Sequence, residues 1–296
     1  MTTFEGIVPA IITPMNSEGG LNEQAFRDVM DFNIRSGVHG FWIAGGTGES
    51  ILLSDEENKR IADIASDQNQ GRVNNIMHVG APTTARAARL AEHAARSGVE
   101  AICCIPPFFY QFSDEEIVEH YRTVAAAADL PLFVYNLPSS TGVEITPGLM
   151  NKIQDGVPQL VGLKHSSSNL EAIRVFSDMG LRAFIGSSMR MLPALTIGAA
   201  GCVDGPPCAA PELWVELWHG YIAKDLARAE KAQMVASDFA EILVKDGFHA
   251  NIKAFISHRL GIDCGAPRPP GSAAPAARID SIIARATELR IGQINL

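Results

Sequence analysis

Several features are missing from this 296-residue sequence, and each absence argues against a class of protein. No apolar stretch is long enough to span a bilayer, and the first residues, MTTFEGIVPA, lack the basic region and long apolar run of a secretory signal peptide. We therefore expect a cytoplasmic protein with no membrane segment. Basic residues number 24 against 33 acidic ones, and the net charge of −9 argues against a nucleic acid partner, because phosphate binding needs a basic face.

Metal-binding and nucleotide-binding motifs are missing as well. The 8 histidines show no clustered spacing and no two cysteines form a C-x-x-C pair, so we predict no metal site. The sequence contains neither G-x-x-x-x-G-K-[ST] nor G-x-G-x-x-G, which excludes the usual phosphate-binding loops. The 5 cysteines form no disulfide framework, which fits reduced thiols. Cys103 and Cys104 lie in an apolar run and are expected to be small buried hydrophobes.

What the sequence does have is a regular alternation of short apolar runs with stretches of helical spacing. The runs are GIVPAIITP, HGFWIAG, NNIMHVG, EAICCIPP, PLFVYN, LVGLKH, RAFIGSS and GCVDG. Asn22 is placed as the N-cap of one helix. Ser54 with Glu57, and Ser113 with Glu116, form capping-box patterns at the starts of two others.

This alternation predicts parallel strands joined by right-handed crossovers. A doubly wound sheet and a closed barrel both satisfy it, but eight units within about the first 210 residues favour the barrel. We predict an α/β fold: a (β/α)8 TIM barrel at residues 1–222, with a C-terminal helical segment at residues 223–296 packed on it. GAPRPPGSAAP is predicted to be a rigid, exposed connection before a last helix, AARIDSIIARATEL.

Reactive side chains follow two of the apolar runs directly. Tyr135 ends the fifth run and Lys164 ends the sixth, while GGTGES follows the second. Because the chemistry of such barrels lies at the C-terminal ends of the strands, all three are expected at one rim.

For Lys164, spacing alone leaves two interpretations open. Partial desolvation at a strand end would favour the neutral amine, which is a nucleophile toward carbonyl groups. The alternative is a lysine at the surface, or one paired with a carboxylate of the barrel. His165 should point to the opposite side of the strand and is not expected to be catalytic.

The other two strand-end features are each weak on their own. The Tyr135 hydroxyl could move a proton, although a tyrosine after PLFV is often only a core aromatic. The backbone amides of GGTGES, helped by the Thr47 hydroxyl, could hold a carboxylate. For Glu49 in this loop we expect a structural role, with its carboxylate accepting backbone amides at a turn or a helix start.

Five segments together resemble a known family. GGTGES, PPFFYQFSDEE, YNLPSSTG, GLKHSSSN and GIDCGAPRPP occur in the order and spacing of the N-acetylneuraminate lyase / dihydrodipicolinate synthase family. Its members are (β/α)8 barrels, usually homotetramers, that form a Schiff base between a lysine and pyruvate or another 2-oxo acid. The resemblance implies that Lys164 forms the imine, that Tyr135 shuttles the proton and that Gly46 and Thr47 hold the 2-oxo acid carboxylate. It also implies that the backbone carbonyl of Val203 faces the pyruvate end.

Departures from the family pattern narrow the substrate. Dihydrodipicolinate synthases typically have a hydroxyl residue where this chain has Gly46, an arginine at Ser140, and at Phe109 a tyrosine that reaches into a neighbouring subunit; here Tyr110 is adjacent. These three losses disfavour that activity. PPFFYQFSDEE is similar to sialic acid lyases, but those place acidic residues where this chain has Ser188 and Met189. AGGTGE also resembles the loop of 5-dehydro-4-deoxyglucarate dehydratases.

The resulting hypothesis is a class I, metal-independent lyase that needs no cofactor beyond its covalent lysine imine. It would cleave, or form by condensation, a 2-keto-3-deoxy-type acid, with pyruvate and an aldehyde as the products of cleavage. Ser140, Ser166 and Ser188 would face the variable end of the substrate, whereas Arg190 is expected to be an exposed helix arginine. A dehydratase that uses the same lysine, and a non-catalytic, oligomeric 2-oxo acid binder, remain the alternatives. The partners expected are a small 2-oxo acid and, as the family implies, further copies of the chain in a homotetramer.

Overall fold

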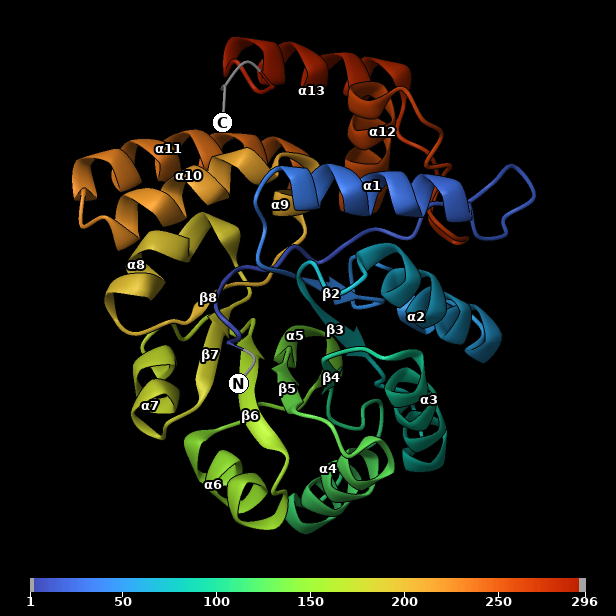
Figure 1. Ribbon diagram of the computed structural model, residues 1–296, viewed down its shortest axis with the longest axis vertical. Coiled ribbons are helices and arrows are strands. Elements are labelled where there is room, and N and C mark those ends of the chain that lie inside the picture. Colours follow the sequence, from blue (N-terminus) through green and yellow to red (C-terminus); the bar gives the residue numbers. More distant parts are fainter. Residues whose placement is uncertain (1–2, 293–296) are drawn as a thin grey trace.

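A computed structural model describes residues 3–292 of the chain (Figure 1). Eight parallel strands form one sheet in the order β1-β8-β7-β6-β5-β4-β3-β2. The strands are β1 (Gly6–Ile7), β2 (Gly40–Ile43), β3 (Asn74–His78), β4 (Ala101–Cys104), β5 (Leu132–Asn136), β6 (Leu160–His165), β7 (Arg182–Ile185) and β8 (Gly201–Cys202). The first and last strands of this order are joined by backbone hydrogen bonds, from the amide of His39 to the carbonyl of Ile7 (2.8 Å) and from Trp42 to Pro9 (2.9 Å). The sheet therefore closes on itself, and the predicted (β/α)8 barrel is confirmed.

Helices follow the strands and surround the barrel (Figure 1). Those up to the eighth strand are α1 (Glu23–Arg35), α2 (Asp55–Asn69), α3 (Thr84–Ser97), α4 (Asp114–Ala128), α5 (Pro138–Thr141), α6 (Pro147–Gly156), α7 (Ala172–Asp178) and α8 (Met191–Thr196), with 3₁₀ turns η1 (Ser50–Leu52) and η2 (Ser188–Arg190). After the eighth strand come α9 (Pro206–Ala209), α10 (Pro211–Ile222), α11 (Leu226–Val244), α12 (Phe248–Leu260) and α13 (Ala276–Glu288). No helix within residues 3–292 is long and apolar enough to cross a membrane.

The predicted helix starts are confirmed by their capping contacts. The Asn22 side chain accepts a hydrogen bond from the amide of Ala25 at the start of α1. Ser54 and Ser113 each form a complete capping box with the glutamate three residues later, at the starts of α2 and α4. Each cap satisfies backbone donors that the helix cannot pair internally, so local sequence determines where these helices begin.

Apolar side chains pack in two layers, one between strands and helices and one inside the barrel. The inner layer includes Trp42, Ile76, Phe133, Phe184 and Val203, so the barrel is filled by side chains and is not a pore. Cys103 belongs to this layer and Cys104 to the outer one, and both are fully buried, as predicted. Burial raises the pKa of both thiols, which keeps them protonated and inert.

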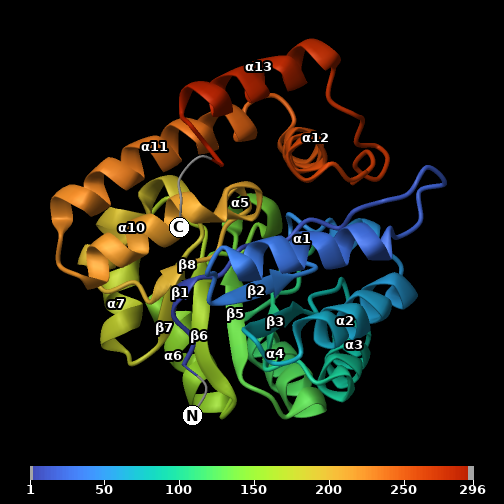
Figure 2. The ribbon, with the colours of Figure 1, turned by 45° about the horizontal axis from the view of Figure 1, so that its top comes forward.

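The C-terminal helices lie across one end of the barrel. Figure 2 shows α12 and α5 at the end toward which the strands run. The proposed division between residues 222 and 223 falls between α10 and α11, and these two helices pack along each other. The outermost residues of the two proposed units, 1–2 and 293–296, lie outside the described part of the chain.

The segment GAPRPPGSAAP is largely exposed, as predicted, but it is anchored to the rest of the molecule at Pro267 and Arg268. Pro267 is buried, and the Arg268 side chain is bound to residues near the start of the chain. Proline and glycine keep this segment from being helical, but its contacts place it over the end of the barrel and make it part of the site described next.

Candidate active site

Lys164 and Tyr135 lie side by side at the ends of two neighbouring strands. They are direct partners in the parallel pairing of β5 with β6. The Lys164 amine nitrogen stands 4.3 Å from the centroid of the Tyr135 ring and 5.5 Å from that of Trp42. Trp42 also packs edge-on against Tyr135, at 5.7 Å between ring centroids. Aromatic faces therefore surround the amine, and strand register alone brings it to the phenol.

The surroundings of Lys164 decide between the two interpretations that the sequence left open. Its side chain is buried, with 4% of the residue exposed, so it is not a surface lysine. Among residues 3–292 it forms no ion pair with a carboxylate, unlike Lys253, the other buried lysine. The position of Lys164 therefore fits the nucleophile interpretation better than that of a surface or ion-paired lysine.

A cavity of about 720 Å³ opens at this end of the barrel. Gly46, Tyr135 and Ser140 are the predicted site residues in its lining. The other lining segments include η1, the ends of β3 and β4, the start of α12 and residues 267–272. Lys164 itself is not among the lining residues, but its neighbour Tyr135 is, so the amine adjoins the cavity next to the phenol.

The GGTGES loop is folded into a tight turn beside the phenol. The amide of Glu49 donates to the Gly46 carbonyl (3.1 Å) and that of Ser50 donates to the Gly45 carbonyl (3.4 Å). Within the described chain, the amides of Gly46 and Thr47 donate to no protein group. A methyl group on Gly46 would stand 3.9 Å from the Tyr135 hydroxyl oxygen, so the free amides adjoin the phenol. This arrangement suits a carboxylate, as the sequence suggested.

The Thr47 side chain does not line the cavity. It is buried, and its hydroxyl points toward the loop after β8, where a methyl group on Gly205 would come within 2.9 Å of Oγ1. That same methyl group would collide with the ring of Phe248 from α12. Because Gly205 has no side chain, the Thr47 loop and α12 can approach each other at this point.

Glu49 ties this loop to the C-terminal part of the chain. One carboxylate oxygen lies 2.6 Å from the amine of Lys253 on α12, and both side chains are almost wholly buried. The other oxygen accepts the backbone amide of Arg268 (2.7 Å). The expected structural role is confirmed, although the amide comes from a residue 219 positions away rather than from a local turn.

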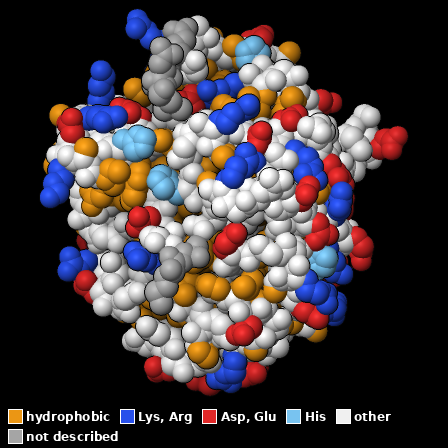
Figure 3. Space-filling model, viewed as in Figure 1, with side chains coloured by type: hydrophobic (Ala, Val, Ile, Leu, Met, Phe, Trp, Pro, Cys, Tyr) orange, Lys and Arg blue, Asp and Glu red, His pale blue; other side chains and the backbone are white. Residues whose placement is uncertain are grey.

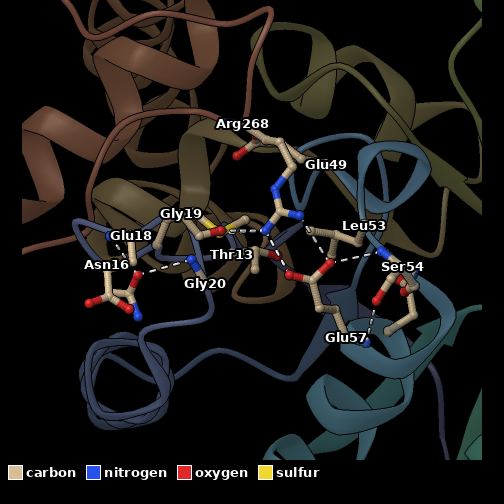
Figure 4. Close-up of polar contacts among 12 residues, drawn as sticks. Thr13, Asn16, Glu18, Gly19, Gly20, Glu49, Leu53, Ser54, Glu57 and Arg268 are labelled. Atoms are coloured by element: carbon tan, nitrogen blue, oxygen red, sulfur yellow. Dashed lines mark hydrogen bonds and ion pairs between the residues drawn. The ribbon is translucent and has the colours of Figure 1, made fainter.

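The Arg268 side chain extends this link to the first loops of the chain. Its guanidinium donates to both carboxylate oxygens of Glu57 (2.7 and 3.0 Å) and to the Gly19 carbonyl (2.7 Å), as Figure 4 shows. The same Glu57 completes the capping box of α2 with Ser54. The Arg268 hydrogen bonds lower the pKa of Glu57 against the opposing effect of burial, so this carboxylate stays charged.

His78 is a residue of the cavity that the sequence analysis missed. It ends β3, is buried, and shares a hydrogen bond between its Nδ1 and the Ser50 hydroxyl (3.3 Å). Burial, and secondarily the charge of Lys164, lowers its pKa to about 4, so the ring is neutral near pH 7. Its Nε2 is buried and has no hydrogen-bond partner in the described chain. It follows an apolar run, as Tyr135 and Lys164 do, and the strand-end argument would have found it.

Two of the predicted substrate-binding serines lie away from the cavity. Ser188 begins η2, and this turn directs its carbonyl to Trp214 of α10 (3.1 Å), while its amide donates to Asp204 (2.7 Å). Ser166 Oγ is buried against the backbone of Gly186 and has no partner in the described chain. Neither hydroxyl is in the cavity lining, and the role of the two serines in substrate binding stays a prediction.

The remaining predicted residues occupy the expected sides of the barrel. Val203 is fully buried in the inner layer that contains Tyr135 and is not in the cavity lining, so the role of its carbonyl stays a prediction. Arg190 is exposed and donates to the Ser168 carbonyl (3.2 Å), as expected for a helix arginine. His165 faces the helical layer, where it contacts Phe176 and accepts a hydrogen bond at Nδ1 from the Asn136 side-chain amide (3.2 Å). It therefore holds the β5 and β6 ends together from the side opposite Lys164.

Comparison with known proteins matches residues 3–281 to the family described as the "Dihydrodipicolinate synthetase family". The chain belongs to this family. It is 34% identical to the N-acetylneuraminate lyase of Rhizobium meliloti over 271 residues, which cover 90% of this chain and 89% of that one. It is 31% identical to the 4-hydroxy-tetrahydrodipicolinate synthase of Methanopyrus kandleri, with 90% of each chain covered.

Solved structures agree with this assignment. A catalytic lysine mutant of the Ruminococcus gnavus sialic acid aldolase matches with a TM-score of 0.93 at 26% identity, over 97% of this chain and 96% of that one. This family consists of class I, pyruvate-dependent lyases that work through a lysine Schiff base without a metal cofactor. Within residues 3–292 no three His, Cys, Asp or Glu side chains are grouped as metal ligands. The relatives carry different named activities, so family membership alone leaves the substrate open.

Proposed function

We propose that this protein is an aldolase that cleaves a 4-hydroxy-2-oxo acid, of the 2-keto-3-deoxy type, to pyruvate and an aldehyde, or joins them by condensation. Lys164 would form the imine, Tyr135 would move the proton, and the amides of Gly46 and Thr47 would hold the carboxylate. The observation that carries the proposal is the contact between the buried Lys164 amine, which has no carboxylate partner in the described chain, and the ring of Tyr135, which lines the cavity. The distance from the amine nitrogen to the ring centroid is 4.3 Å.

The reaction follows from these positions. The neutral Lys164 amine adds to the C2 carbonyl, and water leaves with the proton of the Tyr135 phenol. This gives a phenolate and a protonated imine that withdraws electrons from C3. Tyr135, as phenolate, takes the proton of the C4 hydroxyl while the C3–C4 bond breaks. The bond pair moves into an enamine of pyruvate and the aldehyde departs. Protonation at C3 and addition of water to the imine then release pyruvate and restore the amine.

The carboxylate position supports this geometry. Free amides beside the phenol would fix one end of the substrate and so present C2 to the amine in a near-attack arrangement. The part of the substrate beyond C4 would extend into the cavity past Ser140. Dihydrodipicolinate synthases have an arginine at this position, which binds a second carboxylate of their substrate, and this chain lacks it. This feature supports an aldolase over a dihydrodipicolinate synthase.

Borohydride reduction in the presence of pyruvate tests the proposal. Mass spectrometry of the digested protein should locate one reduced pyruvate adduct, on the peptide that carries Lys164. Lys231, exposed on α11, provides an internal control that should remain unmodified. A folded protein with no adduct at Lys164 in excess pyruvate would contradict the proposed mechanism.

Product analysis separates the aldolase from the alternatives. An aldolase releases pyruvate and an aldehyde in equal amounts from the same substrate, whereas a dehydratase releases water and no aldehyde. An imine without turnover of any 2-oxo acid would leave a binding protein. The cytoplasmic location and the homotetramer expected from the sequence stay predictions. The exposed Phe109 and Tyr110, after β4, are the side chains that a neighbouring subunit in such a tetramer would cover.

A further inference from the structure

The wall of the cavity beyond the reactive groups is mostly apolar. Six large apolar side chains contribute to it from η1, the end of β4, the end of β5 and the start of α12. They are Ile51, Leu52, Ile105, Phe108, Leu137 and Phe248. Phe108 and Leu137 also pack against the inner layer that contains Tyr135, which places them next to the reaction centre.

The charged side chains of the lining are already neutralised within the chain. Arg268 is occupied by Glu57 and the Gly19 carbonyl, and Glu49 by Lys253 and the Arg268 amide. No other Lys, Arg, Asp or Glu side chain of the described residues lines the cavity. A second carboxylate on the substrate would therefore be desolvated without a free cation to pair with.

Most hydroxyl groups of the lining already form hydrogen bonds within the protein or take part in the proposed reaction. Thr141 Oγ1 donates to the Leu137 carbonyl (3.0 Å), and the Ser50 hydroxyl is shared with His78. The Tyr135 hydroxyl is reserved for the reaction in our proposal. Few polar side-chain groups of the described lining remain for a polyhydroxylated chain: Ser140 and Ser272, both in exposed positions, and one ring nitrogen each of His78 and His249. Each further hydroxyl of such a substrate would lose its water without gaining a protein partner.

We infer that the natural substrate carries a bulky apolar group, an aromatic ring or a branched alkyl chain, on C4 of the 4-hydroxy-2-oxo acid. The aldehyde product would then be aromatic or branched aliphatic rather than a sugar or a carboxylate-bearing aldehyde. This inference rests on the proposed function, and it replaces the expectation that serines would bind sugar hydroxyls. A cavity of about 720 Å³ fits such a group, since sites of this size hold molecules much larger than pyruvate.

The full-length protein can be tested with three aldols of pyruvate, made with benzaldehyde, glyceraldehyde and glyoxylate. Initial rates of pyruvate release give kcat/KM for each. We expect the benzaldehyde aldol to exceed both others by at least about tenfold, the scale on which an apolar pocket discriminates. An equal or higher value for the glyceraldehyde or the glyoxylate aldol would overturn the inference.

A variant of the wall provides a second test. Leu137→Ser places a hydroxyl in the apolar wall and should lower kcat/KM for the benzaldehyde aldol about tenfold relative to the glyceraldehyde aldol. Leu226→Ser makes the same change at an exposed position on α11 and should alter neither value. A loss of the same factor for both aldols in Leu137→Ser would show that the wall does not select, and the inference would be wrong.

Borohydride trapping with pyruvate alone separates this inference from the proposed function, because pyruvate lacks the C4 substituent that the wall would select. An adduct on Lys164 together with a preference for the glyceraldehyde aldol would refute only the apolar substrate. The absence of an adduct with pyruvate and with every aldol would refute the lysine mechanism, and the inference with it.

Discussion

Lys164 and Tyr135 are opposite each other in the pairing of β5 with β6, and the amine nitrogen lies over the face of the phenol ring. A register shift of one residue in either strand would turn one of the two side chains to the helical layer. The relationship is thus a property of the sheet, and each residue can be removed separately to test a separate step.

Lys164→Met should abolish the trapped pyruvate adduct and lower turnover by roughly 10⁴-fold or more, because no other nucleophile replaces the amine. Methionine keeps the length of the side chain in an aromatic environment, so the fold should persist. Borohydride trapping, activity and thermal unfolding measure these effects together. Lys231→Met on α11 is the matched exposed control, and residual adduct in Lys164→Met would contradict the assignment.

Tyr135→Phe should retain the adduct with pyruvate but slow cleavage of the aldol by about 10²- to 10⁴-fold, the usual contribution of a proton-transfer group. The ring and its packing on Trp42 stay, and only the hydroxyl is lost. Single-turnover measurements give the rate of imine formation with pyruvate and the rate of C–C cleavage with the aldol, which distinguishes the two steps. Tyr221→Phe, which removes a hydroxyl bonded to the Leu195 carbonyl, should leave turnover unchanged. Unchanged cleavage in Tyr135→Phe would show that another group moves the proton.

Lys253→Met should lower the free energy of unfolding by about 3–5 kcal/mol, because Glu49 would remain buried without its partner. Urea denaturation measures this cost. The double variant with Glu49→Gln should recover part of it, since no unpaired charge then remains. Asp178→Asn, which breaks an exposed pair with Arg174 on α7, should cost under about 1 kcal/mol. A similar loss in the free energy of unfolding for Lys253→Met and for Asp178→Asn would contradict the argument that burial makes the Glu49–Lys253 pair important.

Stability should fall between about pH 6.5 and pH 4 through two buried histidines. Burial is the main cause that lowers the pKa of His78 and of His120 from 6.5 to about 4. In this range the unfolded chain binds protons that the folded chain does not, so unfolding becomes easier as the pH falls. A shift of this size corresponds to roughly 3 kcal/mol for each ring.

Urea midpoints across this pH range test that expectation. His78→Gln and His120→Gln should each flatten the slope between pH 6.5 and pH 4. His258→Gln, at an exposed position on α12, is the control. A slope that neither buried substitution changes would show that carboxylates alone determine the pH dependence.

Gly205→Ala should raise KM for pyruvate about tenfold, because the added methyl group would displace Thr47 and the ring of Phe248. The Gly205 backbone has right-handed helical angles, so alanine brings no backbone strain there and the effect is purely steric. Gly148→Ala on α6 meets nothing closer than 3.8 Å and is the matched control. An unchanged KM would mean that the Thr47 loop does not position the substrate.

The sequence predicted the barrel and its central pair because both depend on local and repetitive information. Apolar runs separated by capped helices define the strands, and the residues that end them lie at one rim. Tyr135, Lys164 and Gly46 were found in this way, and His78 obeys the same rule although it was overlooked. The caps at Asn22 and Ser54 were equally local and equally predictable.

Residues brought to the site by distant segments could not be found in this way. Lys253 and Arg268 come from α12 and from a proline-rich segment whose composition indicated an exposed connection. Only tertiary packing places them on Glu49. Ser188 differs in another way, because it lies in a 3₁₀ turn after β7 in which its carbonyl accepts from Trp214 of α10, a contact that its sequence position does not reveal. The apolar wall was also invisible, since its members come from four separate places in the chain.

The contact of Glu49 with Lys253 and Arg268 has a consequence for synthesis on the ribosome. All eight strands emerge before α12, yet the buried Glu49 carboxylate in the loop that would hold the substrate finds both of its partners in the last sixth of the chain. A nascent barrel that ends before Phe248 would carry its lysine and phenol but leave Glu49 without its partners. We expect such a chain to be inactive until its final helices are released, so that catalysis begins only in the completed polypeptide.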